Sequence, residues 1–581
     1  MSSSQSRPLA DISDAFADAI ETVTGERRDP TVIASGDGRF GDYQCNAAMG
    51  LAKRRSAETG EKVNPRELAQ ELIGAVELGD LAETPTVAGP GFINVTLRPN
   101  WVAGELKRRA ADPRLGLPAA GEPQTVVVEY SSPNIAKQLH VGHLRSTILG
   151  DCIARVLDTL GHKVIRQNHV GDWGTQFGML IAHMNHLGES ADSDIKDLDG
   201  FYKAAKQRFD DDPAFQDEAR DTVVKLQSGG DAERAAWKAL IDATRAHYLP
   251  LYGRLGVQLR EADERGESFY NLRLSPLTDE LLAAGVLEES EGAVVSTHGG
   301  FKTPLIVRKT GGGFGYGTTD LAAAEFRAKE LKADRVIYLV DQRQGQHFKQ
   351  VFATVAAAAD KASWPTADVS YEHAAFGMVL GEDGRPFKAR GGKSVKLADL
   401  LQEAVVRAEA VVREKNPSIP DDQVGGIAEA VGIGAVKYAD LSRDRSTDYV
   451  FDYDQMLQPV GNTGPYLQYA HARICSIFRK AGDHDLDGVT PATDAPEELA
   501  LAKHLLRFGE AVETVARELR PHHLCTYLYE LASRVNSFYQ ACPVLKSDEP
   551  VRSQRLALCR VTGDTLARGL ELLGIEHPDQ M

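Results

Sequence analysis

The sequence predicts an α/β protein with a Rossmann-like parallel-sheet core, a small α+β unit before the core and an all-α bundle after it. Two observations predict this fold class. In the central part of the chain, short β-branched apolar runs alternate with segments of helical periodicity, which is the pattern of strand–helix–strand crossovers in a parallel sheet. Beyond about residue 400 the periodicity becomes almost wholly helical.

The first part of the chain, residues 1–110, is expected to form the small α+β unit. Residues 8–23, PLADISDAFADAIETV, have helical periodicity, and residues 88–99, AGPGFINVTLRP, alternate like a strand. Between them, residues 35–46, SGDGRFGDYQCN, are rich in turn-forming residues. Pro and Gly are frequent in residues 108–124, RRAADPRLGLPAAGEPQ, which are therefore predicted to be a linker.

A Rossmann-type domain with insertions is expected over residues 120–400. Its first unit comprises a strand at 125–130, TVVVEY, a helix over 143–161 and a second strand at 163–170, KVIRQNHV. Residues 334–355, DRVIYLVDQRQGQHFKQVFATV, repeat the strand–helix pattern. Ligands of open parallel sheets bind at the carboxyl ends of the strands, so functional side chains are expected there.

Composition and charge are those of an ordinary globular protein of the cytoplasm. The 581 residues carry 66 Lys+Arg against 83 Asp+Glu, a net charge of −17, so nucleic acid can bind only through local basic faces. No apolar run approaches the ~18 residues of a membrane span, and the N-terminus has no signal-like apolar region. The six cysteines lie far apart without a CxxC pair, which argues against disulfides and against protein-bound zinc.

The segment 126–151, VVVEYSSPNIAKQLHVGHLRSTILGD, runs from an apolar strand into a helix start that carries two histidines. A first helical turn has free N–H groups and suits a phosphate, and His140 and His143 would share one side of it. Gly142 leaves room for a flat ring against the backbone, and Lys137 adds a positive charge. A helix start with two incidental histidines is the alternative, but the flanking strand, helix and lysine favour a nucleotide site.

The HVGH turn resembles the HIGH signature of class I aminoacyl-tRNA synthetases. The longer run SSPNIAKQLHVGHLRSTILGD, with NHVGDWGTQFG at 168–178, closely resembles the arginyl-tRNA synthetase family. The resemblance implies that His140, Gly142 and His143 bind ATP while the carboxylate of arginine attacks its α-phosphate. It also implies Mg²⁺ accompanying ATP, held largely by phosphates and water.

An arginine pocket needs fixed carboxylates and other acceptors, because a guanidinium is planar, always charged and carries five donors. The resemblance places this pocket at Glu129, Asn134, Tyr316, Asp320 and Gln344. Glu129 and Asn134 would face the α-amino and carboxylate end, Tyr316 and Asp320 the guanidinium, and Gln344 would close the pocket. The alternatives are that Asp320 favours a helix dipole and that Tyr316 is a packed aromatic.

A second class I signature, the mobile KMSKS loop, has a counterpart without that spelling in residues 381–401, GEDGRPFKARGGKSVKLADLL. This basic, glycine-containing loop suits neutralisation of a triphosphate, with Lys388 as the first candidate and Arg390 beside it. The resemblance implies that Lys137, ahead of the HVGH turn, compensates for the missing KMSKS lysine. A solvated basic loop or an RNA contact is the alternative.

The two ends of the chain resemble the tRNA-binding parts of the family. After a helical connector at 401–460, residues 461–581 resemble the DALR anticodon-binding bundle, with Tyr466, Arg473 and the terminal Met581 as candidate contacts. The N-terminal unit resembles the domain that contacts the tRNA elbow, through Phe40, Tyr43, Gln44 and Asn46. Core packing is the alternative for the aromatic residues of both regions.

Together with the resemblance, these features predict an arginine–tRNA ligase whose partners are tRNA(Arg), L-arginine and ATP. A monomer is expected, although the sequence does not give the oligomeric state. Two alternatives remain from the sequence. One is an HxGH nucleotidyltransferase that uses no tRNA, which the RNA-binding-like flanks disfavour. The other is a non-catalytic, synthetase-derived RNA-binding protein, which the complete HVGH turn and arginine pocket disfavour.

Overall fold

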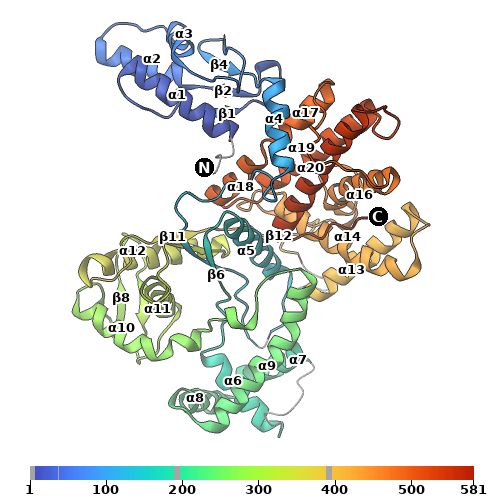
Figure 1. Ribbon diagram of the computed structural model, residues 1–581. Coiled ribbons are helices and arrows are strands. Elements are labelled where there is room, and N and C mark those ends of the chain that lie inside the picture. Colours follow the sequence, from blue (N-terminus) through green and yellow to red (C-terminus); the bar gives the residue numbers. More distant parts are fainter. Residues whose placement is uncertain (1–6, 37, 136, 189–196, 388–394) are drawn as a thin grey trace.

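The computed structural model describes residues 7–36, 38–135, 137–188, 197–387 and 395–581. The N-terminal unit, drawn in blue, lies at one end of the molecule, and the sheet-containing central part lies at the other (Figure 1). The C-terminal helices, in orange and red, lie between them. Among the described residues, no helix is long and apolar enough to cross a membrane.

The N-terminal unit is α+β, with a four-stranded antiparallel sheet in the order β1-β2-β4-β3. Its elements are α1 Pro8–Thr24, β1 Val32–Ala34, η1 Gly38–Phe40, β2 Tyr43–Cys45, α2 Ala47–Thr59, α3 Pro65–Ala75, β3 Thr86–Ala88, β4 Phe92–Val95 and α4 Pro99–Ala110. The predicted first helix and final strand are confirmed. The turn-rich segment, however, contains strand β2, which was missed because three residues are too few to show an alternating pattern.

The central sheet is parallel throughout, as predicted, with the strand order β11-β10-β5-β6. Its strands and their connecting helices are β5 Thr125–Glu129, α5 Val141–Thr159, β6 Lys163–Gln167, β10 Arg335–Tyr338, η4 Gln342–Gln344, α12 Gly345–Lys361 and β11 Ser370–His373. From β5 the chain crosses to β6 on one side, and from β10 it crosses to β11 on the other. The strand order therefore reverses between β5 and β10, which opens a crevice at their carboxyl ends.

A long insertion separates β6 from β10. The sequence predicted that the domain contains insertions, but not which helices and strands they form. This insertion contains helices and a three-stranded antiparallel sheet in the order β7-β8-β9. The elements are α6 Thr175–His186, α7 Leu198–Asp211, α8 Pro213–Ser228, α9 Asp231–Arg254, η2 Glu261–Asp263, η3 Glu267–Tyr270, α10 Asn271–Ala283, β7 Glu288–Ser290, β8 Ala293–Ser296, β9 Leu305–Arg308 and α11 Tyr316–Lys329. Helix α11 leads directly back into the sheet at β10.

The C-terminal part is helical, as predicted. Its elements, with one two-stranded parallel pair of β12 and β13, are β12 Val379–Leu380, α13 Leu397–Lys415, α14 Asp421–Leu441, β13 Tyr449–Val450, α15 Tyr453–Met456, α16 Gly464–Ala481, α17 Pro496–Leu505, α18 Phe508–Glu518, α19 His522–Ala541 and α20 Val551–Leu572. One apolar core runs through the N-terminal, central and C-terminal parts. The segment predicted to be a linker is packed into this core, since Leu115 and Leu117 are buried.

Candidate active site

A cavity of about 790 Å³ lies at the carboxyl ends of β5 and β10, where the strand order reverses. Eight of the predicted site residues line it: Glu129, Asn134, His140, Gly142, His143, Tyr316, Asp320 and Gln344. They come from five separate stretches of the chain, and the fold brings them around one volume. We call it the central cavity.

The two histidines of the HVGH turn begin helix α5, with His140 as the N-cap. The backbone N–H of Gly142 donates to Nδ1 of His140 over 3.0 Å, and the N–H of His140 donates to Nδ1 of His143 over 3.1 Å. Because Nδ1 accepts in both rings, Nε2 is the ring nitrogen that carries the proton and can donate. Burial, followed by the neighbouring His140, lowers the pKa of His143 to about 3, so His143 is neutral at pH 7.

Gly142 has a structural requirement that the sequence argument did not identify. A Cβ at this position would lie 2.8 Å from Cε1 and 2.9 Å from Nδ1 of His140. Any side chain would therefore displace the imidazole that caps the helix. Because Gly142 has no side chain, the His140 ring keeps its position and the backbone stays open to a ligand.

Lys137 is not among the residues that line the central cavity. Its ammonium lies 4.4 Å from the centroid of the Tyr202 ring on α7, in a cation–π contact. The helical insertion thus holds this side chain beside the cavity in the present structure, and contact with a phosphate would require Lys137 to leave Tyr202.

The basic loop joins the cavity at both of its described flanks. On one side, Pro386 and Phe387 line the cavity. On the other side of the loop, the N–H of Val141 donates to the carbonyl of Val395 over 3.1 Å. The N–H of Leu397 donates to the carbonyl of Leu139 over 2.9 Å. The loop is therefore anchored to the HVGH turn itself. Lys388 and Arg390 lie outside the described residues.

Asp320 of α11 and Glu267 of η3 form an acidic part of the cavity, which we call its acidic end. Four carboxylates line the cavity, and its two guanidinium groups each pair with an acid, Arg343 with Asp341 and Arg145 with Asp440. Asp320, in the first turns of α11, lies 2.5 Å from Nε2 of His347. Tyr316 begins the same helix and is 73% exposed, so it is not a packed core aromatic. This arrangement suits a cationic ligand.

Glu267 is a cavity residue that the sequence argument missed. It begins the short helix η3 in the insertion, for which no elements were predicted from the sequence. Burial, then the charges of Asp172 and Asp320, raise the pKa of Glu267 to about 8. A carboxyl kept protonated mainly by burial, with two acids nearby, is suited to ionise when a cation arrives. The signal available in the sequence, one acid in ESFY, was too short to single it out.

Glu129, the last residue of β5, is 5% exposed and forms an ion pair with the buried Arg327 of α11. Glu129 was predicted from the sequence as a site residue, whereas its partner Arg327 was not. Asn134 forms a bridge with Gly171, and a Cβ on that glycine would lie 2.4 Å from Oδ1 of Asn134. Gln344 ends η4 and is exposed at the cavity rim.

The N-terminal residues predicted to contact RNA differ in how they are presented. Phe40 is 45% exposed, whereas the ring of Tyr43 is 1% exposed. The Tyr43 hydroxyl donates to Glu510 of α18 over 2.7 Å, so this tyrosine joins the N-terminal unit to the C-terminal helices and cannot stack on a base here. Gln44 donates to Asn94 over 2.9 Å, and Asn46 is the residue that precedes α2.

Replacing Tyr43 with Phe removes the hydrogen bond to Glu510 but keeps the aromatic ring. Because this hydrogen bond is made by a buried tyrosine to a half-buried carboxylate, we expect a loss of roughly 1–3 kcal/mol of stability. It is read as a lower unfolding temperature, with the KM for tRNA unchanged. Phe40→Ala serves as the matched variant and should raise the KM for tRNA with little change in stability. A raised KM in Tyr43→Phe with normal stability would contradict this assignment.

In the C-terminal bundle, the structure groups aromatic rings around one arginine. The Arg473 guanidinium lies 4.7 Å from the Tyr469 ring and 5.6 Å from the Tyr539 ring, which are 43% and 46% exposed. Tyr466 is half-buried and accepts a hydrogen bond from Asn536 over 2.7 Å. The exposed members suit stacking on unpaired bases. Tyr539 was missed by the sequence argument because it lies 66 residues beyond Arg473.

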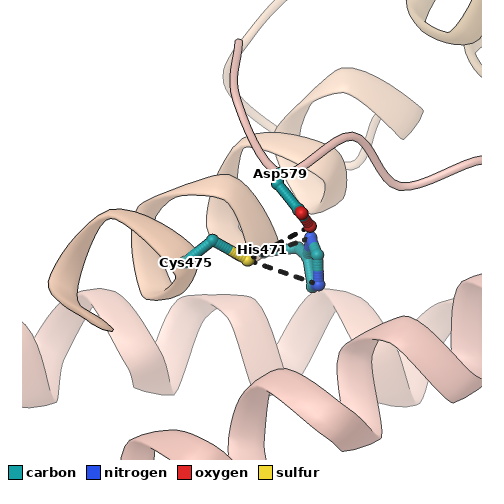
Figure 2. A group of neighbouring side chains, drawn as sticks. All are labelled: His471, Cys475 and Asp579. Atoms are coloured by element: carbon teal, nitrogen blue, oxygen red, sulfur yellow. Dashed lines mark hydrogen bonds between the residues drawn. The ribbon is translucent and has the colours of Figure 1, made fainter. Parts of the chain in front are cut away.

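Met581 is held in place at the chain terminus. Its side chain packs against the core, and its carbonyl accepts from Asn416 over 2.9 Å. Figure 2 shows a cluster nearby, in which His471 and Cys475 of α16 face Asp579 of the C-terminal segment. The thiol of Cys475 donates to Asp579 over 3.6 Å, and His471 bonds the backbone of Pro578. These contacts fasten the C-terminal segment to α16.

His471, Cys475 and Asp579 are also potential metal ligands, which cysteine spacing alone could not show. Burial, then Asp579, raise the pKa of the Cys475 thiol to about 11, so we expect a protonated thiol and substoichiometric zinc in the purified protein. Elemental mass spectrometry measures this directly. One zinc per chain that is lost in Cys475→Ser would contradict the expectation.

The fold and the cavity define the catalytic domain of a class I tRNA synthetase: a parallel sheet whose first crossover helix begins with a histidine pair at the site where the strand order reverses. The family model for the class I (R) tRNA synthetase catalytic domain matches residues 109–453. The model for the arginyl-tRNA synthetase N-terminal domain matches residues 10–97, and that for the DALR anticodon-binding domain matches residues 467–581.

The chain belongs to the arginyl-tRNA synthetase family. It is 49% identical to the arginine–tRNA ligase of Hahella chejuensis over 97% of this chain and 98% of that protein. It is 46% identical to that of Synechococcus elongatus over 99% and 100% of the two chains. The arginyl-tRNA synthetase structures from Plasmodium falciparum and Thermus thermophilus superpose with TM-scores of 0.86 and 0.82, each at 30% identity and with at least 99% of both chains covered.

Proposed function

We propose that this protein is an arginine–tRNA ligase, which activates L-arginine with ATP and transfers the arginyl group to the 3′ end of tRNA(Arg). The observation that carries this proposal is the continuity of the central cavity. One volume joins a helix start that suits phosphates to an acidic region that suits a guanidinium. In the first step the arginine carboxylate attacks the α-phosphate of ATP, forming arginyl-adenylate and releasing pyrophosphate.

At the phosphate end, the first turn of α5 offers backbone N–H groups and its positive end. His140 and His143 add neutral donors at Nε2, whose proton is assigned by the acceptor role of each Nδ1. Such donors stabilise the charge that grows on the α-phosphate oxygens without needing a proton transfer. Gly142 keeps the His140 ring in place. Mg²⁺ would enter with ATP and be held largely by phosphates and water.

At the acidic end, Asp320 and Glu267 would hold the guanidinium, with Tyr316 beside them on α11. Glu129 and Asn134 would face the α-ammonium and carboxylate, and Gln344 would close the rim. Catalysis then consists of placing the carboxylate in line with the α-phosphate and stabilising the charge that develops.

The basic loop would neutralise the leaving pyrophosphate, with Lys388 as the first candidate and Arg390 beside it. Its support is the anchoring of the loop to Leu139 and Val141. Lys137 would assist by releasing Tyr202.

The tRNA would contact both ends of the chain. Phe40, Gln44 and Asn46 would contact its elbow, whereas Tyr43 keeps a structural role. Arg473, with Tyr469 and Tyr539, would contact the anticodon, and Tyr466 and Met581 would support that surface. The boundaries 1–110, 120–400, 401–460 and 461–581 remain our proposed domain division, and we propose a cytoplasmic monomer.

ATP–pyrophosphate exchange across the amino acids, with and without total tRNA, tests the function. We expect exchange with arginine only, together with arginylation of tRNA. Exchange with arginine but no charging of any tRNA would favour a nucleotidyltransferase. Absence of exchange in protein that still binds RNA would favour a non-catalytic RNA-binding protein.

A further inference from the structure

The guanidinium of Arg327 lies beneath the central cavity, at the carboxyl edge of the parallel sheet. It is completely buried and is not among the cavity-lining residues. It contacts the last residue of each of three adjacent strands. Nη2 donates to Glu129 of β5, Nε donates to Gln167 of β6 over 2.7 Å, and Cζ lies 4.9 Å from the ring of Tyr338 on β10.

These three strand ends lie in register, since Glu129 pairs with Tyr338 on one side and with Gln167 on the other. Of the three, only Glu129 lines the central cavity. Arg327 therefore holds from behind a carboxylate whose front faces the ligand. Burial is the largest effect and opposes the charge of the guanidinium, but Glu129, Tyr338 and Tyr270 together raise the pKa of Arg327, so the guanidinium stays charged.

Stability alone is a weak reason for this arrangement. Desolvation offsets most of the attraction in a buried ion pair, and apolar replacements of such pairs are often neutral or stabilising. Moreover, Nη1 of Arg327 is buried with no hydrogen-bond partner among the described residues. An unpaired buried donor adds a further cost. The arrangement is better explained by the orientation that it gives to Glu129.

Helix α11 connects the two ends of the cavity. Its first turns carry Tyr316 and Asp320, and Arg327 lies seven residues beyond Asp320, about 10 Å along a helix. Through Arg327 the same helix that presents Asp320 is tied to the strand that presents Glu129. The separation between the two carboxylates is thereby fixed.

We propose that Arg327 is a positioning residue for substrate selection, which holds Glu129 against the α-ammonium of arginine at a fixed distance from Asp320. This inference rests on the proposed function. If the inference holds, Arg327 affects only the α-ammonium end of the substrate, because Arg327 reaches the cavity only through Glu129. A purely structural role would affect every ligand of the cavity.

Two arginine analogues separate these cases in the full-length enzyme. Agmatine keeps the ammonium and lacks the carboxylate, whereas 5-guanidinopentanoate keeps the carboxylate and lacks the ammonium. In Arg327→Met we expect the KM for arginine and the inhibition constant of agmatine to rise roughly 10- to 100-fold, as for the loss of one charge-assisted hydrogen bond. The inhibition constant of 5-guanidinopentanoate and the KM for ATP should stay within about threefold.

Arg335→Met is the matched control. Arg335 pairs with Glu372 over 2.5 Å between β10 and β11 of the same sheet, and neither residue lines the central cavity. It should lower the unfolding temperature without changing the ratio of the agmatine and guanidinopentanoate constants. If Arg327→Met does not fold, Arg327→Lys keeps the charge without the planar fork and should show a smaller change in the same direction.

The inference would be overturned if Arg327→Met weakened the binding of both analogues equally. It would also be overturned if binding were weakened no more than in Arg335→Met. Failure of the proposed function has a different signature, because wild-type protein would then show no arginine-dependent exchange. Glu129→Gln completes the test. Its effect on agmatine should not add to that of Arg327→Met, since both variants disrupt one contact.

Discussion

Replacing His143 with Ala is expected to lower kcat for arginine-dependent pyrophosphate exchange by about 10²–10³-fold, with a smaller change in the KM for ATP. In the proposed mechanism, Nε2 of His143 donates to the charge that appears on the α-phosphate only in the transition state. His143→Gln, whose amide can donate a hydrogen bond, should recover part of the rate. Exchange kinetics at saturating arginine measure the effect.

The pH dependence gives an independent check on His143. Because its pKa is lowered to about 3, the ring stays neutral between pH 6 and 8 and contributes no ionisation to the rate profile in that range. His186→Gln is the control, since His186 is a surface residue paired with Glu218. An ionisation near pH 6.5 that disappears in His143→Ala would contradict the neutral-donor role.

Replacing Asp320 with Asn is expected to raise the KM for arginine by about 10²–10³-fold, because the charge-assisted contact proposed with the guanidinium would be lost. The KM for ATP should change little, because Asp320 is at the acidic end of the cavity. Asp279→Asn, at a surface ion pair with Arg308, is the matched control. Equal losses for arginine and ATP would show that the variant had disturbed the fold instead of the pocket.

Glu267 adds a pH dependence to arginine binding. In the empty cavity its pKa is raised to about 8, so it is protonated at pH 7, and an approaching guanidinium favours the ionised form. Binding should therefore release a proton, and arginine affinity should rise between pH 6 and 8 and then level off. Calorimetry in buffers of different ionisation enthalpy measures the proton release, and Glu267→Gln should reduce it.

Much of the fold could be predicted from local patterns. The parallel sheet, the helix that begins at the HVGH turn and the helical C-terminal part all show periodicities of consecutive residues. The placement of Asp320 and Tyr316 at a helix start was also accessible, because the segment before α11 contains glycines and its continuation is helical. Short elements such as β2 were not, since three residues carry no period.

The sequence by itself determined two local features of the central cavity, the HVGH turn at a helix start and Asp320 in the first turns of α11, because each depends on neighbouring residues. Tertiary structure alone decided how those residues are held. Glu129 meets Arg327 across 198 residues, Tyr43 meets Glu510 across 467, and Cys475 meets Asp579 across 104. Periodicity reports which face of an element is buried, whereas these pairs depend on which elements pack together. That packing is set by the whole core.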